Sequence, residues 1–327
     1  MDNRSLLYLS RQEVASVGLT MRDIIDVVEK GFEELGSGRV EMPPKPGIHP
    51  GEGGDNFIHA MPAYIPALHS AGIKWVSGYP PNQAKGLPYI MGLLILNDPE
   101  TGMPKAVMDC TWITAMRTGA ASAVSAKYLA RPDSCTIGIL ACGVQGHTNL
   151  EAMGVLFPLK KVMAFDINRE QAKRLVDYAE KTLGLETRVV TDPRKAVTGC
   201  DIVVTSGPIL KKPHETIRAG WMDEGAFASL VDFDSFWSRD ALRQADKWTT
   251  DHLGQYRQYK DEAGYFQNCP EVYAALGELV TRKKPGRENQ QERTFAANLG
   301  LAMEDMAVAP LVYRRAVEKK IGSWLPL

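Results

Sequence analysis

The sequence contains a glycine-bearing turn between a short apolar run and an amphipathic segment. The apolar run CTIGILA ends at Ala141, and the turn continues to Gly146. This spacing matches the G-x-G-x-x-G fingerprint of dinucleotide-binding turns, with alanine in place of the first glycine. A side chain at Gly143 would block backbone N–H groups from a pyrophosphate, and Gly146 lets the helix pack closely on the strand. We therefore expect a dinucleotide to contact five consecutive residues: Cys142, Gly143, Val144, Gln145 and Gly146.

An acidic residue follows at the distance that this fingerprint requires. Asp166 ends the apolar run KVMAFD, about twenty residues after Gly146, where such a carboxylate accepts hydrogen bonds from the adenosine ribose. It would repel a 2′-phosphate, so we expect NAD(H); nearby Arg169 leaves NADP(H) as the less favoured alternative. Thr205 and Ser206 follow the run DIVV and either line the same site or form a plain turn.

Three cations lie in apolar or proline-rich surroundings in the first part of the chain. Lys74 lies in the run AGIKWV, Arg117 in TAMRTGAA, and Lys45 between two prolines. Because burying unpaired cations is unfavourable, a cluster of them implies an anionic ligand or acidic partners. Each one taken alone is more often a side chain whose charged end reaches solvent.

The residues after 134 alternate between short apolar runs and helical patterns. Such alternation is typical of a parallel, doubly wound sheet. We expect the run GAFASLVDFD to be one of its strands, and strand alternation would then place Asp232 and Asp234 on the same face. From Phe295 onward we expect one long helix, bent at Pro310.

The residues before 114 predict a mixed α+β domain. A helical pattern with Thr20 as its N-cap spans residues 20–35. A loop or edge rich in Pro and Gly spans 42–56, and the runs YIMGLLILND and PKAVMDC predict a β-hairpin. An Ala-rich segment, 114–130, predicts one helix that links two domains.

These patterns together predict an α/β protein of two domains. Residues 117–294, which include the linking helix, would form a Rossmann-type dinucleotide-binding domain. Residues 1–116 with 295–327 would form an α+β substrate-binding and dimerisation domain.

The composition favours a small-molecule partner. Lys and Arg (38) nearly balance Asp and Glu (39), so no strong field attracts nucleic acid or a membrane surface. No apolar run approaches the ~18–20 residues of a membrane span, and the opening residues lack the apolar core of a signal peptide. The five cysteines include no CxxC pair and the histidines no HExxH motif. We therefore expect a cytoplasmic protein with reduced thiols and no metal site.

A series of motifs resembles the ornithine cyclodeaminase/mu-crystallin family. In chain order they are GIKWVSGYPPN, LLILNDPETGMPKAV, TAMRTGAASAVSAKYLA, GVQG and LGLAMEDMAVAPLVYRRA. The likeness extends from about residue 40 to about residue 320, and the RTGAAS and LGLAMED motifs are specific to the family. It implies an enzyme that uses a nicotinamide cofactor at the carbon–nitrogen bond of a small amino or imino acid.

The resemblance also assigns roles to individual residues. The substrate carboxylate would be held by Lys74 and Arg117, together with Lys45, where relatives often have arginine. Thr118 would help to hold the cofactor phosphates, and Asp234 would position the substrate amine or activate a water. On this basis Lys74 and Asp234 are the expected catalytic residues.

Two positions depart from the family pattern. His59 stands where members that act on ornithine have an acidic residue for the distal amine, and Asp232 stands where relatives have glycine. Both are expected to contact the substrate, and both make ornithine itself doubtful as the substrate.

Hydride transfer between a nicotinamide and the substrate carbon is compatible with several overall reactions. An amino-acid dehydrogenase or imine reductase is expected ahead of an ornithine-type cyclodeaminase, which would release ammonia and recycle NAD. A nucleotide-dependent binding protein or accessory subunit without catalysis is the alternative from another class. The resemblance further implies a homodimer that pairs through the first domain, and the apolar run YIMGLLILND fits a sheet with surface to bury.

Overall fold

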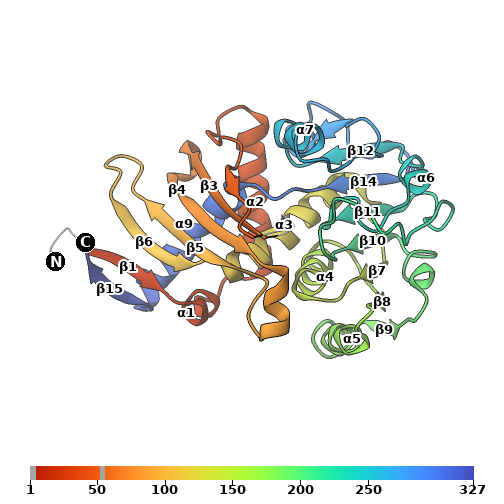
Figure 1. Cartoon of the computed structure of the whole chain (residues 1–327), viewed down its shortest axis with the longest axis horizontal. Helices are drawn as coiled ribbons and strands as arrows, with labels where there is room; N and C mark the ends of the chain where they lie inside the picture. The colour runs from red at the N-terminus through yellow and green to blue at the C-terminus, as the bar shows by residue number, and fades with distance from the viewer. Residues whose placement is uncertain (1–4, 52–55) are drawn as a thin grey trace. The chain divides into compact units, whose positions relative to one another are not determined.

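The computed structural model describes residues 5–51 and 56–327 (Figure 1). Residues 52–55 of the expected Pro- and Gly-rich loop therefore lie outside the described residues. The chain divides into two compact units: Met1–Arg117 with Leu301–Leu327 forms unit 1, and Thr118–Gly300 forms unit 2. The boundary after Arg117 falls within one long helix, α3 (Thr111–Leu129).

Unit 1 contains a seven-stranded sheet in the order β15-β1-β6-β5-β4-β3-β2. Its strands are β1 (Ser5–Leu9), β2 (Gly47–Ile48), β3 (Phe57–Ile65), β4 (Ser70–Gly78), β5 (Ile90–Asn97), β6 (Pro104–Asp109) and β15 (Ser323–Pro326). Short 3₁₀ helices follow β3 and β4, η1 (Pro66–Leu68) and η2 (Pro80–Lys85). The antiparallel pairing of β5 with β6 confirms the hairpin expected from the sequence.

Helices cover one face of this sheet. Helix α9 (Ala302–Lys319) packs on β3 and β4, α2 (Met21–Gly36) packs on α9, and α1 (Arg11–Ser16) contacts β1 and β6. The N-cap expected at Thr20 is confirmed: its side chain accepts a hydrogen bond from the Asp23 amide, and the Asp23 carboxylate accepts one in return.

Unit 2 is built on an eight-stranded sheet in the order β13-β12-β14-β11-β10-β7-β8-β9, with parallel pairing throughout. Its strands are β7 (Thr136–Leu140), β8 (Lys161–Phe165), β9 (Glu186–Val189), β10 (Ile202–Thr205), β11 (Phe227–Leu230), β12 (Lys247–Thr250), β13 (Ala274–Ala275) and β14 (Thr294–Ala297). The helices are α4 (Val144–Leu156), α5 (Arg169–Leu183), α6 (Arg239–Leu242), α7 (Leu253–Asp261) and α8 (Leu276–Val280), with the 3₁₀ helix η3 (Pro193–Ala196). The strand order reverses between β7 and β10, which is the arrangement of a Rossmann-type fold and confirms the predicted α/β class.

Two expected elements differ from the structure. The single helix expected from Phe295 is wrong, because β14 (Thr294–Ala297) pairs with β11 and β12 before α9 begins at Ala302. The run GAFASLVDFD is a strand only in its first half, since β11 ends at Leu230 and a turn follows. The alternation argument that put Asp232 and Asp234 on one strand face therefore fails.

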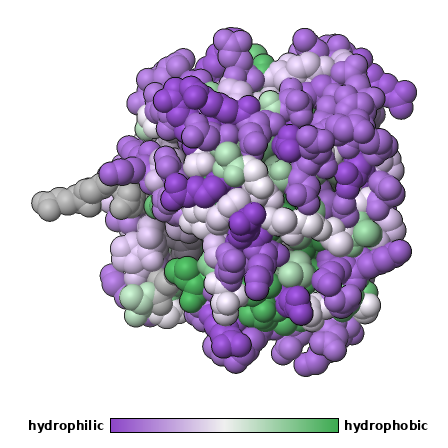
Figure 2. All heavy atoms as spheres, turned by 90° about the vertical axis from the view of Figure 1, so that its right-hand side faces the viewer, coloured by the Kyte–Doolittle hydropathy of each residue, from purple (hydrophilic) through white to green (hydrophobic). Residues whose placement is uncertain are grey.

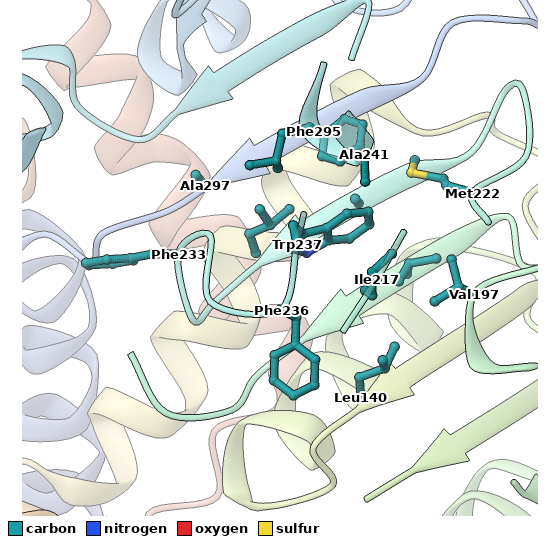
Figure 3. Close-up of a cluster of buried hydrophobic side chains, with 14 of the residues drawn as sticks. Leu140, Val197, Ile217, Met222, Phe233, Phe236, Trp237, Ala241, Phe295 and Ala297 are labelled. Carbon is teal, nitrogen blue, oxygen red and sulfur yellow. The ribbon is translucent and has the colours of Figure 1, made fainter. Parts of the chain in front are cut away.

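Aromatic side chains fix the turn that follows β11 within the core of unit 2 (Figure 3). The Trp237 ring packs edge-to-face on Phe295, with 5.1 Å between ring centroids. The Phe233 ring lies 4.8 Å from that of Phe266, and the Phe233 backbone takes a positive φ of 62°. Since this conformation is unfavourable for a bulky residue, burial of the Phe233 ring must stabilise it.

The face of the molecule drawn in Figure 2 is largely hydrophilic, with apolar side chains gathered toward its lower part. Among the described residues, none of the helices has the length and apolar character needed to span a membrane.

Candidate active site

The fingerprint turn has the backbone geometry that its glycines predict. A Cβ added to Gly143 would meet no atom within 4 Å, so the turn is open at that point to the described residues. A Cβ added to Gly146 would lie 2.8 Å from the carbonyl oxygen of Ala141, so helix and strand approach closely there. Ala141 itself has a φ of 69°, which explains why the fingerprint usually has glycine at this position.

The Asp166 carboxylate lies beside this turn. One of its oxygens accepts a hydrogen bond from the Cys142 amide at 2.7 Å, and the other accepts one from the Asn168 amide at 2.7 Å. The Cys142 thiol points the opposite way, toward the Phe165 carbonyl oxygen at 3.4 Å, and burial raises its pKa. Of Cys142, therefore, only the backbone is placed to contact a ligand at the open side of the turn.

Ser206 and Thr205 have different surroundings although they are adjacent. The Ser206 hydroxyl donates to the Ala141 carbonyl at 2.7 Å and so ties the end of β10 to the fingerprint turn. The Thr205 side chain is fully buried, and its hydroxyl donates to Asp232 at 2.6 Å. Of these two predicted cofactor contacts, Ser206 lies at the fingerprint turn, whereas the Thr205 side chain is buried inside the unit.

In unit 1 the two central cations have buried acidic partners. Lys74 on β4 is 1% exposed, and its Nζ lies 2.6 Å from Oδ2 of Asp305 and 3.4 Å from the Thr114 hydroxyl. Arg117 on α3 lies 2.6 Å from Oε2 of Glu304 through one terminal nitrogen and 3.4 Å from Oδ1 of Asp305 through Nε. Both acids are completely buried. We call these four residues the ion cluster: Lys74, Arg117, Glu304 and Asp305.

Sequence reasoning named the two cations of the ion cluster and missed the two acids. Glu304 and Asp305 lie in the first turn of α9, where the helix dipole favours negative charge, and Glu304 Oε1 also accepts a hydrogen bond from the Leu301 amide. The sequence does contain a pattern that indicates these acids: two adjacent acidic residues interrupt the otherwise apolar run LGLAMEDMAVA, and they can be buried only beside cations.

His59 and Lys45 lie near Lys74. The His59 ring stacks on Phe57 with 4.4 Å between ring centroids, and β3 places it two residues from Met61, which pairs with Lys74 across the sheet. Burial, followed by the charges of Lys45, His49 and Lys74, lowers the pKa of His59 to about 3. His59 is therefore a neutral imidazole at pH 7, and Lys45 is half-buried beside it.

The two carboxylates after β11 point to different partners. Asp232 is fully buried and accepts hydrogen bonds from the Thr205 hydroxyl and, at 3.2 Å, from the Gly207 amide. Burial raises the pKa of Asp232 to about 7. These contacts join the turn after β11 to the turn after β10.

Asp234 instead lies among residues of the segment that follows α7. It is hydrogen-bonded to the Phe266 amide and the Cys269 thiol, and burial raises its pKa above the ordinary value. Its Oδ1 is buried and has no hydrogen-bond partner among the residues that the structure describes. Asp234 is thus a buried carboxylate that can still accept a proton or a hydrogen bond.

The structure therefore brings the predicted residues together in two sets, one in each unit. The set in unit 1 contains Lys45, His59, Lys74 and Arg117. The set in unit 2 lies at the carboxyl ends of β7, β8, β10 and β11 and contains the fingerprint turn, Asp166, Ser206, Asp232 and Asp234. Thr118 is half-buried on α3, directly after Arg117.

The parallel sheet and its open glycine turn define the chain as a protein with a Rossmann-type unit. The sequence matches the ornithine cyclodeaminase/mu-crystallin family over residues 7–320, and the chain belongs to that family. It is 37% identical to an alanine dehydrogenase from Archaeoglobus fulgidus over 97% of both chains.

Two solved structures are similar over nearly the whole chain. One is Δ1-pyrroline-2-carboxylate reductase from Thermococcus litoralis in complex with NADH and L-proline, with a TM-score of 0.87, 34% identity and coverage of 97% of this chain and 99% of that chain. The other is an archaeal alanine dehydrogenase dimer with bound NAD, with a TM-score of 0.88, 35% identity and coverage of 99% of both chains.

Proposed function

We propose that this protein is an NAD(H)-dependent enzyme that transfers hydride at the carbon–nitrogen bond of a small amino or imino acid. The observation that carries the proposal is the ion cluster, where Lys74 and Arg117 lie together in a buried site of unit 1. The relatives support the reaction class, since they include an alanine dehydrogenase and a Δ1-pyrroline-2-carboxylate reductase.

The residues of unit 2 fit a dinucleotide. The open space at Gly143 allows a pyrophosphate to approach the N-terminus of α4, whose helix dipole favours an anion. The Asp166 carboxylate can accept further hydrogen bonds from ribose hydroxyls, and the neighbouring Ile167 is 98% exposed and offers an apolar surface for adenine. NAD(H), when bound, accepts or supplies the hydride.

The residues of unit 1 fit the other substrate group, a carboxylate. Lys74 and Arg117 carry N–H donors that bind carboxylate oxygens with charge-assisted hydrogen bonds, and half-buried Lys45 adds a third positive charge nearby. Holding the substrate in this way lowers the barrier by fixing its orientation. Asp234, whose pKa burial raises, is suited to exchange a proton with the substrate nitrogen.

Among the reactions of the family, dehydrogenation or imine reduction is favoured over ornithine-type cyclodeamination. A cationic substrate tail needs a carboxylate partner, and the family resemblance implies that His59 stands where ornithine-specific members have one. The His59 ring is stacked on Phe57 and neutral, with only positive charges affecting its pKa. We therefore propose a substrate whose tail lacks a distal amine.

A substrate panel tests this proposal directly. We expect NADH absorbance to fall when the enzyme meets a cyclic 2-imino acid, or a 2-oxo acid with ammonia, because both are reduced to amino acids. Diamino acids provide the contrast. Release of ammonia from ornithine without net change in NADH would establish a cyclodeaminase, and no reaction with any class would favour a binding protein.

The choice of cofactor is tested at Asp166. Asp166→Ser should weaken NADH binding by roughly 10–100-fold, because a charge-assisted hydrogen bond to the ribose is lost, and should improve NADPH relative to NADH. Fluorescence titration with both nucleotides measures the ratio. Asp177→Ser is the matched control, since Asp177 is an exposed residue of α5. An unchanged ratio in Asp166→Ser would show that Asp166 does not select the cofactor.

The roles of Arg117 and Asp234 should separate in steady-state kinetics. Arg117→Met should mainly raise KM, by roughly 10–100-fold, because it deletes a contact made in the ground state. Asp234→Asn should mainly lower kcat, by about 10²–10⁴-fold, if the carboxylate exchanges a proton. Asp232→Asn is measured in parallel. If Asp234→Asn is near normal while Asp232→Asn is inactive, the assignment of Asp234 is wrong.

The uncovered face of the sheet in unit 1 supports a homodimer. Trp75 on β4 is 51% exposed and pairs across the strands with Leu93 on β5, which is 45% exposed. Tyr8 and Tyr64, on β1 and β3, are also exposed. An apolar surface of this kind on a sheet marks an interaction site, and we propose a second copy of the chain as its partner. The similar archaeal alanine dehydrogenase is itself a dimer.

Charge placed on this face should prevent dimer formation. Trp75→Arg should shift the mass measured by light scattering from dimer to monomer, because a cation would be buried without a partner. Val317→Arg is the control, since Val317 is similarly exposed but lies on α9. A wild-type monomer at micromolar concentration, or a dimeric Trp75→Arg variant, would contradict the proposed interface.

A further inference from the structure

In the part of the chain that the structure describes, few groups that can carry charge surround Lys74. Asp305 approaches it from α9 at 2.6 Å, and Arg117 faces it from α3. Cys110 also faces it, but burial raises the pKa of that thiol to about 11, so it stays neutral. On β3, His59 is neutral as well because its pKa is about 3. Among the described residues, the charges that act most directly on Lys74 at neutral pH are therefore those of Asp305, which attracts it, and Arg117, which repels it.

The two cations of the ion cluster depend on their acids in different ways. Arg117 stays charged in any protein environment, because guanidinium does not lose its proton at accessible pH. A buried lysine, in contrast, readily loses its proton when no anion is near. Glu304 forms an ion pair with Arg117, whereas Asp305 lies within ion-pair distance of both cations.

We propose that Asp305 is a positioning residue that keeps the Lys74 ammonium charged and fixed for the substrate carboxylate, whereas Glu304 only orients Arg117. The part of this proposal that concerns the substrate rests on the proposed function. The part that concerns the charge of Lys74 does not.

Removal of the Asp305 charge has a defined effect on stability. Burial already lowers the pKa of Lys74 below its ordinary value of 10.5, and Asp305 opposes this. In Asp305→Asn the pKa of Lys74 falls further, so the unfolded chain binds more protons than the folded one over a wider range of pH. Stability rises with pH wherever this holds. The free energy of unfolding of the variant therefore falls furthest below that of wild type at low pH. This difference shrinks as pH rises toward the pKa of Lys74 in the wild-type fold.

Thermal unfolding from about pH 6 to about pH 10 tests this without any substrate. Asp305→Asn should lower the unfolding midpoint by roughly 5–15 °C at pH 6, and the loss should shrink steadily toward pH 10. Glu304→Gln is the matched control: it is the neighbouring acid in the same helical turn and equally buried, but its partner Arg117 does not titrate. The decrease in the unfolding midpoint of Glu304→Gln should be the same at every pH.

A double variant covers the case in which Asp305→Asn folds poorly. Lys74→Met with Asp305→Asn removes the unpaired buried charge, so it should unfold at a higher temperature than Asp305→Asn alone. Its difference from Lys74→Met should not vary with pH. If the deficit of Asp305→Asn is constant with pH, or if the double variant is no more stable than Asp305→Asn, Asp305 does not control the charge of Lys74.

Kinetics then test the link to the substrate. Above the lowered pKa of Lys74, Asp305→Asn should raise KM for a carboxylate substrate by about tenfold per pH unit, as the ammonium loses its proton. Glu304→Gln should raise KM by a factor that does not vary with pH. If the stability pattern is found but KM of Asp305→Asn follows wild type, Lys74 does not bind the carboxylate, and the proposed substrate role fails while the counter-ion role stands.

Discussion

The arrangement of unit 1 depends on burying two cations without leaving either unpaired. Breaking a buried ion pair costs about 3–5 kcal/mol, so the first turn of α9 must stay against β4 and α3 wherever Lys74 and Arg117 are buried. A second link acts at the same place, because the buried Ser70 hydroxyl on β4 donates to the Met306 carbonyl at 2.6 Å. The residues proposed to bind substrate are thus fixed by the contacts that hold the C-terminal helix on the sheet.

A different constraint acts in unit 2, at the turn after β11. Its aromatic side chains pack into the core, and the positive φ of Phe233 sends the neighbouring carboxylates in different directions. Asp232 turns toward Thr205 and fixes the turn after β10, whereas Asp234 turns toward Cys269. Asp232 therefore has a structural partner inside the unit, whereas Asp234 keeps an oxygen without a hydrogen bond from the described residues.

The sequence predicted those features whose signals are local. The fingerprint turn, the carboxylate of Asp166 and the cap at Thr20 each depend on a few neighbouring residues, and the structure has all three. The wrong predictions fall where a short apolar run fits more than one element: the run from Phe295 fits a helical pattern, although its first residues pair as a central strand, β14. The end of β11 at Leu230 depends on packing of aromatic rings far away in the chain, which no local pattern records.

The charges of the ion cluster also determine how an anionic group can be recognised there. Its two cations and two acids cancel, so it exerts little long-range attraction on an anion. An ammonium has three N–H donors, and in the described part of the chain Lys74 forms an ion pair with Asp305 and a hydrogen bond with the Thr114 hydroxyl. A carboxylate that reaches Lys74 is therefore held by short, directional bonds in a buried place where salt screens weakly. Half-buried Lys45 is better placed to attract the substrate from a distance, and that contribution is the one that salt should weaken.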